Sequence, residues 1–118
     1  MIQKRTVGII GCGNVGSAAA YVLFNRDVAS DIILVDKDPR RAEGEAMDLM
    51  HGQAFAEPVN VRAGTFEDLA GAQVIVMAAG TPRKEGESRL DLLNRNVTIL
   101  RDIVQQLDTF APNAILVI

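Results

Sequence analysis

The stretch Thr6-Val-Gly-Ile-Ile-Gly-Cys-Gly-Asn-Val-Gly-Ser17 decides the fold of this chain. Its first half is a β-branched apolar run of the kind that forms a central strand buried on both faces. Its second half is a glycine-rich turn, and an alanine-rich helical pattern follows at once. We therefore predict a strand over residues 5–10, a tight turn at the glycines and a helix that begins directly after them.

Each of the three glycines has a separate task in such a turn. Gly11 permits the sharp change of direction, Gly13 lets a pyrophosphate approach the backbone, and Gly16 lets the helix pack closely on the strand. The free N–H groups and the positive end of the helix dipole would face the same anion. By itself the glycine pattern is weak evidence, because glycine-rich turns are common.

The next apolar run, Ile32-Ile-Leu-Val-Asp36, makes this interpretation more specific. Asp36 follows Gly16 by 20 residues, a spacing at which a carboxylate reaches the ribose hydroxyls of a bound dinucleotide. The same carboxylate repels a 2′-phosphate, so we predict NAD rather than NADP as the cofactor. We interpret the nearby cations Lys37, Arg40 and Arg41 as the solvated start of a helix.

The rest of the chain alternates strand and helix patterns. Apolar runs at residues 59–63, 74–78 and 114–118 predict three more strands, and helical patterns separate them. This alternation is typical of an α/β fold. We expect a Rossmann-type, doubly wound parallel sheet of three layers with strand order 3-2-1-4-5.

Helix boundaries and helix faces also follow from the sequence. Asp38 and Pro39 suit the N-cap and first position of a helix that Gly52 ends, while Thr65–Asp68 and Ser88–Asp91 suit capping boxes. Apolar residues recur at helical spacing, and we expect them to mark three helices. They are Val15, Ala18, Ala19, Val22 and Leu23 on one face of the first, Ala42, Ala46, Leu49 and Met50 on a face of the second, and Leu93, Val97, Leu100, Val104 and Leu107 in the long third.

Composition excludes several classes of function. The net charge is -3, the pI is near 5.0 and no stripe of Lys and Arg stands out, which argues against a nucleic-acid surface. No apolar run has membrane-spanning length. The one cysteine, Cys12, excludes an internal disulfide and suggests a reducing compartment. We expect a cytoplasmic protein without a metal site, and a structural role for the one histidine, His51.

A polar segment, Thr81-Pro-Arg-Lys-Glu-Gly-Glu-Ser-Arg89, joins the fourth strand to the long helix. It is longer and more charged than a plain connection needs. One interpretation is a solvated surface loop. The other is a lid that closes over a substrate and delivers an arginine to it. Its position at the carboxyl edge of the sheet, where ligands sit in such folds, favours the lid.

Taken together, these motifs resemble the N-terminal, NAD-binding part of the L-lactate/L-malate dehydrogenase family. The resemblance covers essentially all 118 residues. It includes Gly11-Cys-Gly-Asn-Val-Gly16, Asp36, Ala42-Glu-Gly-Glu-Ala-Met-Asp-Leu49 and, most specifically, Ala79-Gly-Thr-Pro-Arg-Lys-Glu-Gly-Glu-Ser-Arg-Leu-Asp-Leu92. It implies hydride transfer between a nicotinamide ring and C2 of a small 2-oxo or 2-hydroxy acid.

The resemblance also implies roles for single residues. Arg89 matches the lid arginine that polarises the substrate carbonyl and stabilises oxyanion character as hydride arrives. Asn96 matches a residue that contacts cofactor or substrate. The full set implied for cofactor binding is Gly11, Gly13, Asn14, Val15, Gly16, Asp36, Ala79, Gly80 and Asn96.

Arg83 matches the position that distinguishes substrates, where malate enzymes carry arginine and lactate enzymes typically glutamine. A guanidinium holds a second carboxylate bidentately, whereas over the methyl group of pyruvate it would be an unpaired charge. Yet Met47-Asp-Leu-Met-His-Gly52 and Glu87 are more similar to the lactate branch. We expect malate and oxaloacetate because Arg83 would touch the distinguishing group, with lactate and pyruvate as the close alternative.

The family's acid/base histidine, its aspartate partner and the arginine that anchors the substrate carboxylate lie in a later part of such enzymes. His51 does not match that histidine. We therefore expect residues 1–118 to form an NAD-binding domain that stops before a sixth strand and a catalytic domain, and to bind NAD without catalysing a reaction. The complete protein is expected to be a homo-oligomer, a dimer or tetramer.

Two alternatives remain open at this point. The chain would suit a stand-alone dinucleotide-sensing module, although such a module has no need of the segment between Arg83 and Arg89. It would also suit an isolated domain without activity, whose exposed strand edges and long helix would make it prone to self-association.

Overall fold

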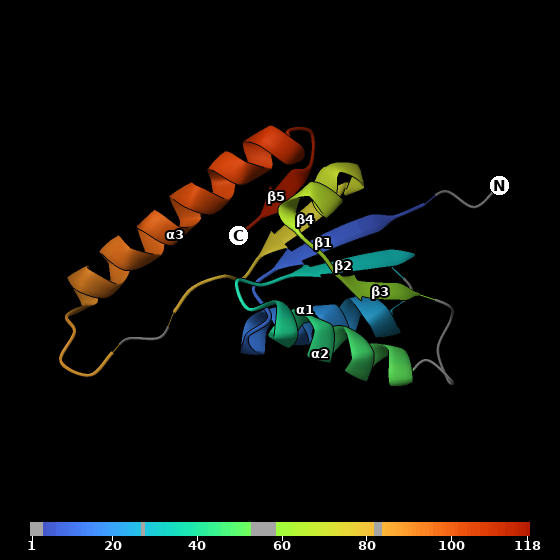
Figure 1. Ribbon diagram of the computed structural model, residues 1–118, viewed down its shortest axis with the longest axis horizontal. Helices are drawn as coiled ribbons and strands as arrows, with labels where there is room; N and C mark the ends of the chain where they lie inside the picture. Colours follow the sequence, from blue (N-terminus) through green and yellow to red (C-terminus); the bar gives the residue numbers. More distant parts are fainter. Residues whose placement is uncertain (1–3, 27, 53–58, 82–83) are drawn as a thin grey trace.

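The computed structural model describes residues 4–26, 28–52, 59–81 and 84–118. At its centre lies β1 (Thr6–Ile10), between β2 (Asp31–Val35) and β4 (Val74–Met77), with β3 (Asn60–Ala63) and β5 (Ile115–Val117) outermost. All neighbouring strands are parallel, and their order is β3-β2-β1-β4-β5. The predicted fold and strand order are confirmed (Figure 1).

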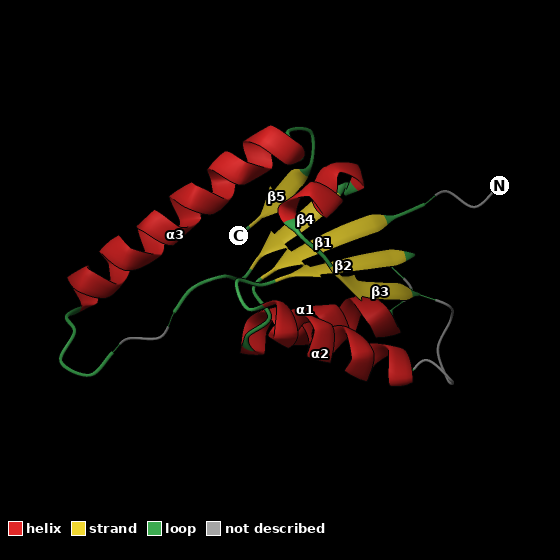
Figure 2. Cartoon of the chain, viewed as in Figure 1, coloured by secondary structure: helices red, strands yellow, loops and turns green. Residues whose placement is uncertain are grey.

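Helices cover both faces of the sheet. Figure 2 shows α1 (Asn14–Asn25) and α2 (Pro39–His51) on one face, and α3 (Arg89–Phe110) with the short 3-10 helix η2 (Phe66–Gly71) on the other. The core accordingly has two parts. Ile9, Ile32 and Leu34 pack toward α1 and α2, whereas Ile10 and Ile75 lie in the cluster with η2 and α3.

The buried face of α1 differs from the prediction. Gly16, Ala20 and Phe24 are its buried residues, while Val15 and Val22 are 71% and 52% exposed. Ala18 is exposed too, and Ala19 and Leu23 are half-buried. The cause is Gly16, since a Cβ there would collide with the carbonyl oxygen of Gly11. The glycine must face the strand end, and residues four and eight positions later face the sheet with it.

The predicted face of α2 is confirmed: Ala42, Ala46 and Leu49 are buried, and Met50 packs against them. The helix begins as expected, with Pro39 at its first position. The Asp38 carboxylate caps it by accepting a hydrogen bond from the Arg40 N–H at 3.1 Å. Its C-terminal cap is Gly52, whose N–H donates to the Leu49 carbonyl.

The predicted helix α3 is confirmed, but only some of its regularly spaced apolar residues are buried. Ile103 and Leu107 are its buried residues, and Ile99 and Leu100 pack partly beside them. Leu93, Val97 and Val104 are exposed. Figure 1 shows why for the first of these: the N-terminal half of α3 extends beyond the sheet, so only the C-terminal half has a core to pack against.

Both predicted capping boxes form. The Asp68 carboxylate accepts a hydrogen bond from the Thr65 N–H at 2.7 Å, and this bond holds the pKa of Asp68 below its usual value. At the start of α3, the Ser88 hydroxyl accepts from the Asp91 N–H at 3.1 Å, and the Asp91 carboxylate accepts from the Ser88 N–H. Among the described residues, no helix is long and apolar enough to cross a membrane.

Replacing Gly16 by alanine tests the close contact between α1 and β1. We expect Gly16→Ala to lower the free energy of unfolding by about 2 kcal/mol, because the new methyl group meets backbone that cannot move away easily. Gly44→Ala in α2 is the matched control, since a Cβ there meets nothing within 4 Å. It should raise stability by about 0.5 kcal/mol through helix propensity. Urea denaturation measures both, and equal stabilities for the two variants would contradict the expectation.

A second prediction concerns Cys12, which is 5% exposed. Burial, with added repulsion from the Asp36 and Glu45 carboxylates, raises the pKa of Cys12 from 9.0 to about 11. The unfolded thiol ionises first, so the stability that this thiol contributes is complete below pH 9 and is lost as pH rises through about 11. Urea denaturation at pH 8 and pH 10.5 should therefore show a larger loss for the wild type than for Cys12→Ala. Equal losses would contradict the buried-thiol account.

Candidate functional site

The glycine turn after β1 has the geometry that the sequence predicted. Gly11 has a φ of +97°, in the left-handed region that favours glycine. A Cβ at Gly11 would also lie 2.7 Å from the Ala79 backbone nitrogen, so β4 passes directly beside the turn. The Gly11 N–H donates to the Val35 carbonyl at 2.7 Å. The turn is thereby bonded to the end of β2 and lies directly against the residues that follow β4.

Gly13 faces open space, in contrast to the two crowded glycines beside it. It is exposed, and a Cβ added there would meet no atom within 4 Å. Gly13 is also the N-cap of α1, and no side chain of the described residues caps this helix. The amides of the first turn, at Asn14, Val15 and Gly16, can therefore bind an anion at the positive end of the helix dipole.

Asp36 stands at the end of β2 with its carboxylate held by two backbone amides. One oxygen accepts from the Cys12 N–H at 2.7 Å, and the other accepts from the Asp38 N–H at 2.9 Å. Each carboxylate oxygen has a further lone pair for another donor. The carboxylate is thus fixed next to the glycine turn and can still accept hydrogen bonds from two ribose hydroxyls.

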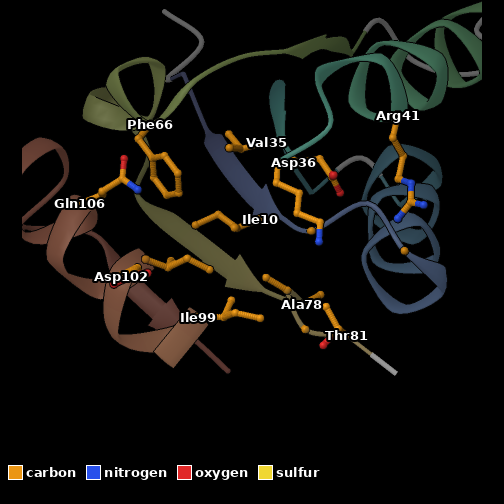
Figure 3. A pocket seen from close by; sticks show the side chains of 16 residues that line it. Ile10, Val35, Asp36, Arg41, Phe66, Ala78, Thr81, Ile99, Asp102 and Gln106 are labelled. Atoms are coloured by element: carbon orange, nitrogen blue, oxygen red, sulfur yellow. The ribbon is translucent and has the colours of Figure 1, made fainter. Parts of the chain in front are cut away.

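These groups border a cavity of about 330 Å³ at the carboxyl ends of β1, β2 and β4. The strand order reverses here between β1 and β4, which is where ligands bind in doubly wound sheets. Figure 3 shows Asp36 and Arg41 on one side and Phe66, Asp102 and Gln106 on the other. An apolar wall with a few polar groups at its rim is typical of a small-molecule site.

Five of the predicted cofactor residues line this cavity: Gly11, Gly13, Asp36, Ala79 and Gly80. Asn14 and Val15 are exposed in the first turn of α1, outside the lining. Of the cations interpreted as solvated, Lys37, Arg40 and Arg41 are all exposed, but Lys37 and Arg41 also border the cavity.

Two more of the predicted site residues, Arg89 and Asn96, are not among the residues that line the cavity. Arg89 is the exposed first residue of α3 and does not line the cavity. Asn96 does not line the cavity, and its side-chain oxygen accepts a hydrogen bond from the Thr81 N–H at 3.2 Å. Arg83 lies outside the described residues.

The sequence did not lead us to predict one wall of the cavity. This wall consists of residues on one face of α3 together with a phenylalanine of η2, namely Ile99, Asp102, Ile103, Gln106 and Phe66. The α3 residues recur at i, i+3, i+4 and i+7, so the spacing itself held the information. What the spacing alone could not supply is the direction in which this face points.

The remaining polar candidates lie away from this chemistry. His51 is exposed at the end of α2 and does not line the cavity. Within the described ranges, no group of three or more His, Cys, Asp or Glu side chains is placed to hold a metal ion. The observations at Gly13, Asp36 and the uncapped helix fit a dinucleotide such as NAD.

Comparisons with known proteins agree with this geometry. A family model described as the NAD binding domain of lactate/malate dehydrogenase matches residues 5–118. An L-lactate dehydrogenase of Salinibacter ruber is 57% identical over 119 residues, which cover 100% of this chain and 38% of that protein. The chain thus spans little more than a third of this relative's length. Nothing in these matches supports a stand-alone sensing module.

Solved structures give the same result. The minor L-lactate dehydrogenase of Enterococcus mundtii superimposes with a TM-score of 0.92 at 39% identity, covering 96% of this chain and 36% of that one. The malate dehydrogenase of Archaeoglobus fulgidus in complex with NADH superimposes with a TM-score of 0.84 at 37% identity, covering 94% and 38%. This chain belongs to the lactate/malate dehydrogenase family and is its NAD-binding domain.

Proposed function

We propose that the complete protein is an NAD-dependent L-2-hydroxyacid dehydrogenase, of which residues 1–118 form the cofactor-binding domain. The observation that carries the proposal is the cavity where Gly13, the uncapped start of α1 and the fixed Asp36 carboxylate meet. Bound NADH supplies the hydride. The residues of this domain bind and orient the cofactor, and the acid/base chemistry belongs to a catalytic domain that follows.

Within this domain, the glycine turn and the amides of α1 would hold the pyrophosphate, and Asp36 would hold the adenosine ribose. Ala79 and Gly80 would line the cofactor channel, and Asn96 would contact cofactor or substrate. Arg89 would polarise the substrate carbonyl by stabilising negative charge on its oxygen as hydride arrives. Arg89 lies at the start of a helix, so it reaches the substrate only with the segment that precedes it in place.

The substrate we propose is oxaloacetate or malate, on the strength of Arg83. A guanidinium in that position pairs with a second carboxylate, and an unpaired cation disfavours a methyl group there. Lactate and pyruvate are the second candidate. They are supported by the similarity of this chain to the L-lactate dehydrogenases of Salinibacter ruber and Thermus aquaticus.

We further infer that the complete protein is a cytoplasmic homo-oligomer. A single, buried cysteine suits a reducing compartment. Apolar side chains left exposed on α1 and α2, among them Val15, Val22 and Met47, offer a surface for further packing. The isolated domain is expected to bind NAD and to have no catalytic activity.

Asp36→Asn tests the assignment of the cofactor. Loss of the negative charge should weaken NAD binding about 10-fold and reduce the preference for NAD over NADP, because the repulsion of a 2′-phosphate disappears. Asp38→Asn is the matched control, since it removes a charge two residues away and asparagine also caps helices well. Isothermal titration with both dinucleotides measures the ratio, and an unchanged ratio in Asp36→Asn would refute the role.

Arg83→Gln tests the substrate. In the complete enzyme we expect kcat/KM for oxaloacetate to fall about 10- to 100-fold, the loss of one charge-assisted pair, while kcat/KM for pyruvate rises. Lys84→Gln, a neighbouring cation, is the control. A wild-type enzyme that reduces pyruvate far better than oxaloacetate with Arg83 intact would overturn the malate assignment in favour of lactate.

A further inference from the structure

One guanidinium ties together the two ends of the connection between β4 and α3. Arg95 lies in the second turn of α3. Its Nε donates to the Thr81 hydroxyl at 2.8 Å, and its Nη1 forms an ion pair and hydrogen bond with the Glu87 carboxylate. Thr81 follows the end of β4, and Glu87 directly precedes Ser88, the N-cap of α3. The same side chain therefore holds the first and the last part of the connection.

Backbone hydrogen bonds extend this arrangement on both sides. At the first end, the Thr81 N–H donates to the side-chain oxygen of Asn96, the neighbour of Arg95. At the second end, Glu87 accepts from the Lys84 N–H at 3.2 Å and donates its own N–H to the Lys84 carbonyl at 3.1 Å. Gly86 closes that turn with a φ of +78°. Arg95 thus contacts Thr81, which Asn96 of the same helix also holds, and a turn at residues 84–87 that has its own hydrogen bonds.

The pair between Arg95 and Glu87 is shielded from water. Their side chains are 24% and 14% exposed, whereas in the pair of Arg62 with Asp68 the side chains are 48% and 37% exposed. Shielding reduces dielectric and salt screening, so the attraction is stronger than in a surface pair. Removal of Arg95 would also leave the Glu87 carboxylate partly buried without this partner. We therefore expect this ion pair to stabilise the fold more than the exposed pair of Arg62 with Asp68 does.

The position of Arg95 matters because of what lies on each side of it. Thr81 lines the cavity together with Ala79 and Gly80, and Arg89 is the first residue of the helix that carries Arg95. A bond from Arg95 to Thr81 therefore fixes the start of α3 relative to the cavity wall. Only arginine offers Nε and Nη donors in one rigid plane, so lysine cannot reproduce both bonds with the same geometry.

We propose that Arg95 is a positioning residue for hydride transfer. It anchors the start of α3 to the strand end that lines the cofactor cavity, and so sets where Arg89 stands relative to bound cofactor and substrate. The inference rests on the proposed dehydrogenase activity. Small displacements of a group that acts in the transition state lower the rate of the chemical step more than they lower cofactor binding.

The test uses the complete enzyme with Arg95→Met, Arg95→Lys and, as matched control, Arg101→Met, an exposed arginine of the same helix. For Arg95→Met we expect kcat to fall about 10-fold or more, while KM for NADH changes less than about 3-fold. Arg95→Lys should recover part of the loss, because it keeps the charge opposite Glu87. Arg101→Met should match the wild type.

Hydrogen exchange provides a readout that does not depend on activity. In Arg95→Met, the amides of Thr81 and Glu87 should exchange about 10-fold faster, because the bonds that hold their segments are lost. Thermal unfolding midpoints show whether all variants are folded at the assay temperature. A uniform loss of stability would accelerate exchange throughout the core and would not single out these two amides.

The outcomes separate the inference from the proposed function. Unchanged exchange or unchanged kcat in Arg95→Met, with an active wild type, would overturn the positioning role alone. Equal falls in kcat for Arg95→Met and Arg101→Met would overturn it as well. A complete wild-type enzyme that reduces no 2-oxo acid would overturn the proposed function, and the kinetic part of this inference with it.

Discussion

The contact between Gly16 and the carbonyl of Gly11 is the constraint on which the rest of the structure depends. It brings the start of α1 directly onto the end of β1 and fixes the rotation of the helix, so that Ala20 and Phe24 face the sheet. With the helix this close, the open backbone at Gly13, which directly precedes the uncapped first turn, lies at the edge of the cavity. A side chain at position 16 would alter packing and anion binding together.

Asp36 joins this turn to the second strand. Its bond from the Cys12 N–H means that the group proposed for the ribose and the turn proposed for the pyrophosphate share one hydrogen bond. Cys12 itself is buried among apolar residues and close to two carboxylates, and both effects raise the pKa of its thiol further above neutral pH. The Cys12 side chain therefore contributes to core packing, whereas the neighbouring glycine turn and Asp36 are the groups proposed to bind the cofactor.

Local signals in the sequence were sufficient for much of the fold. Pro39 after an N-capping Asp38, the boxes at Thr65 and Ser88, and the apolar runs of the strands each act within a few residues, and the structure has each element at its predicted place. Geometry that depends on contacts between distant residues could not be predicted from the sequence. The rotation of α1 depends on a contact across a turn, and the α3 wall of the cavity depends on the direction of a helix face. The bonds of Arg95 to Thr81 and Glu87 span 14 and 8 residues, and no spacing rule predicts such partners.

The unequal packing of α3 has a mechanical consequence. Its buried contacts, Ile103 and Leu107, lie near one end, and Arg89 lies about 21 Å away along the axis at about 1.5 Å per residue. The helix is therefore held mainly at its C-terminal half, and at the other end the bonds of Arg95 to Thr81 and Glu87 oppose a tilt. A tilt of about 3° about the buried contacts would move its far end by about 1 Å over that length. Substitutions at Leu107, which does not line the cavity, would in this way displace Arg89 without contacting it.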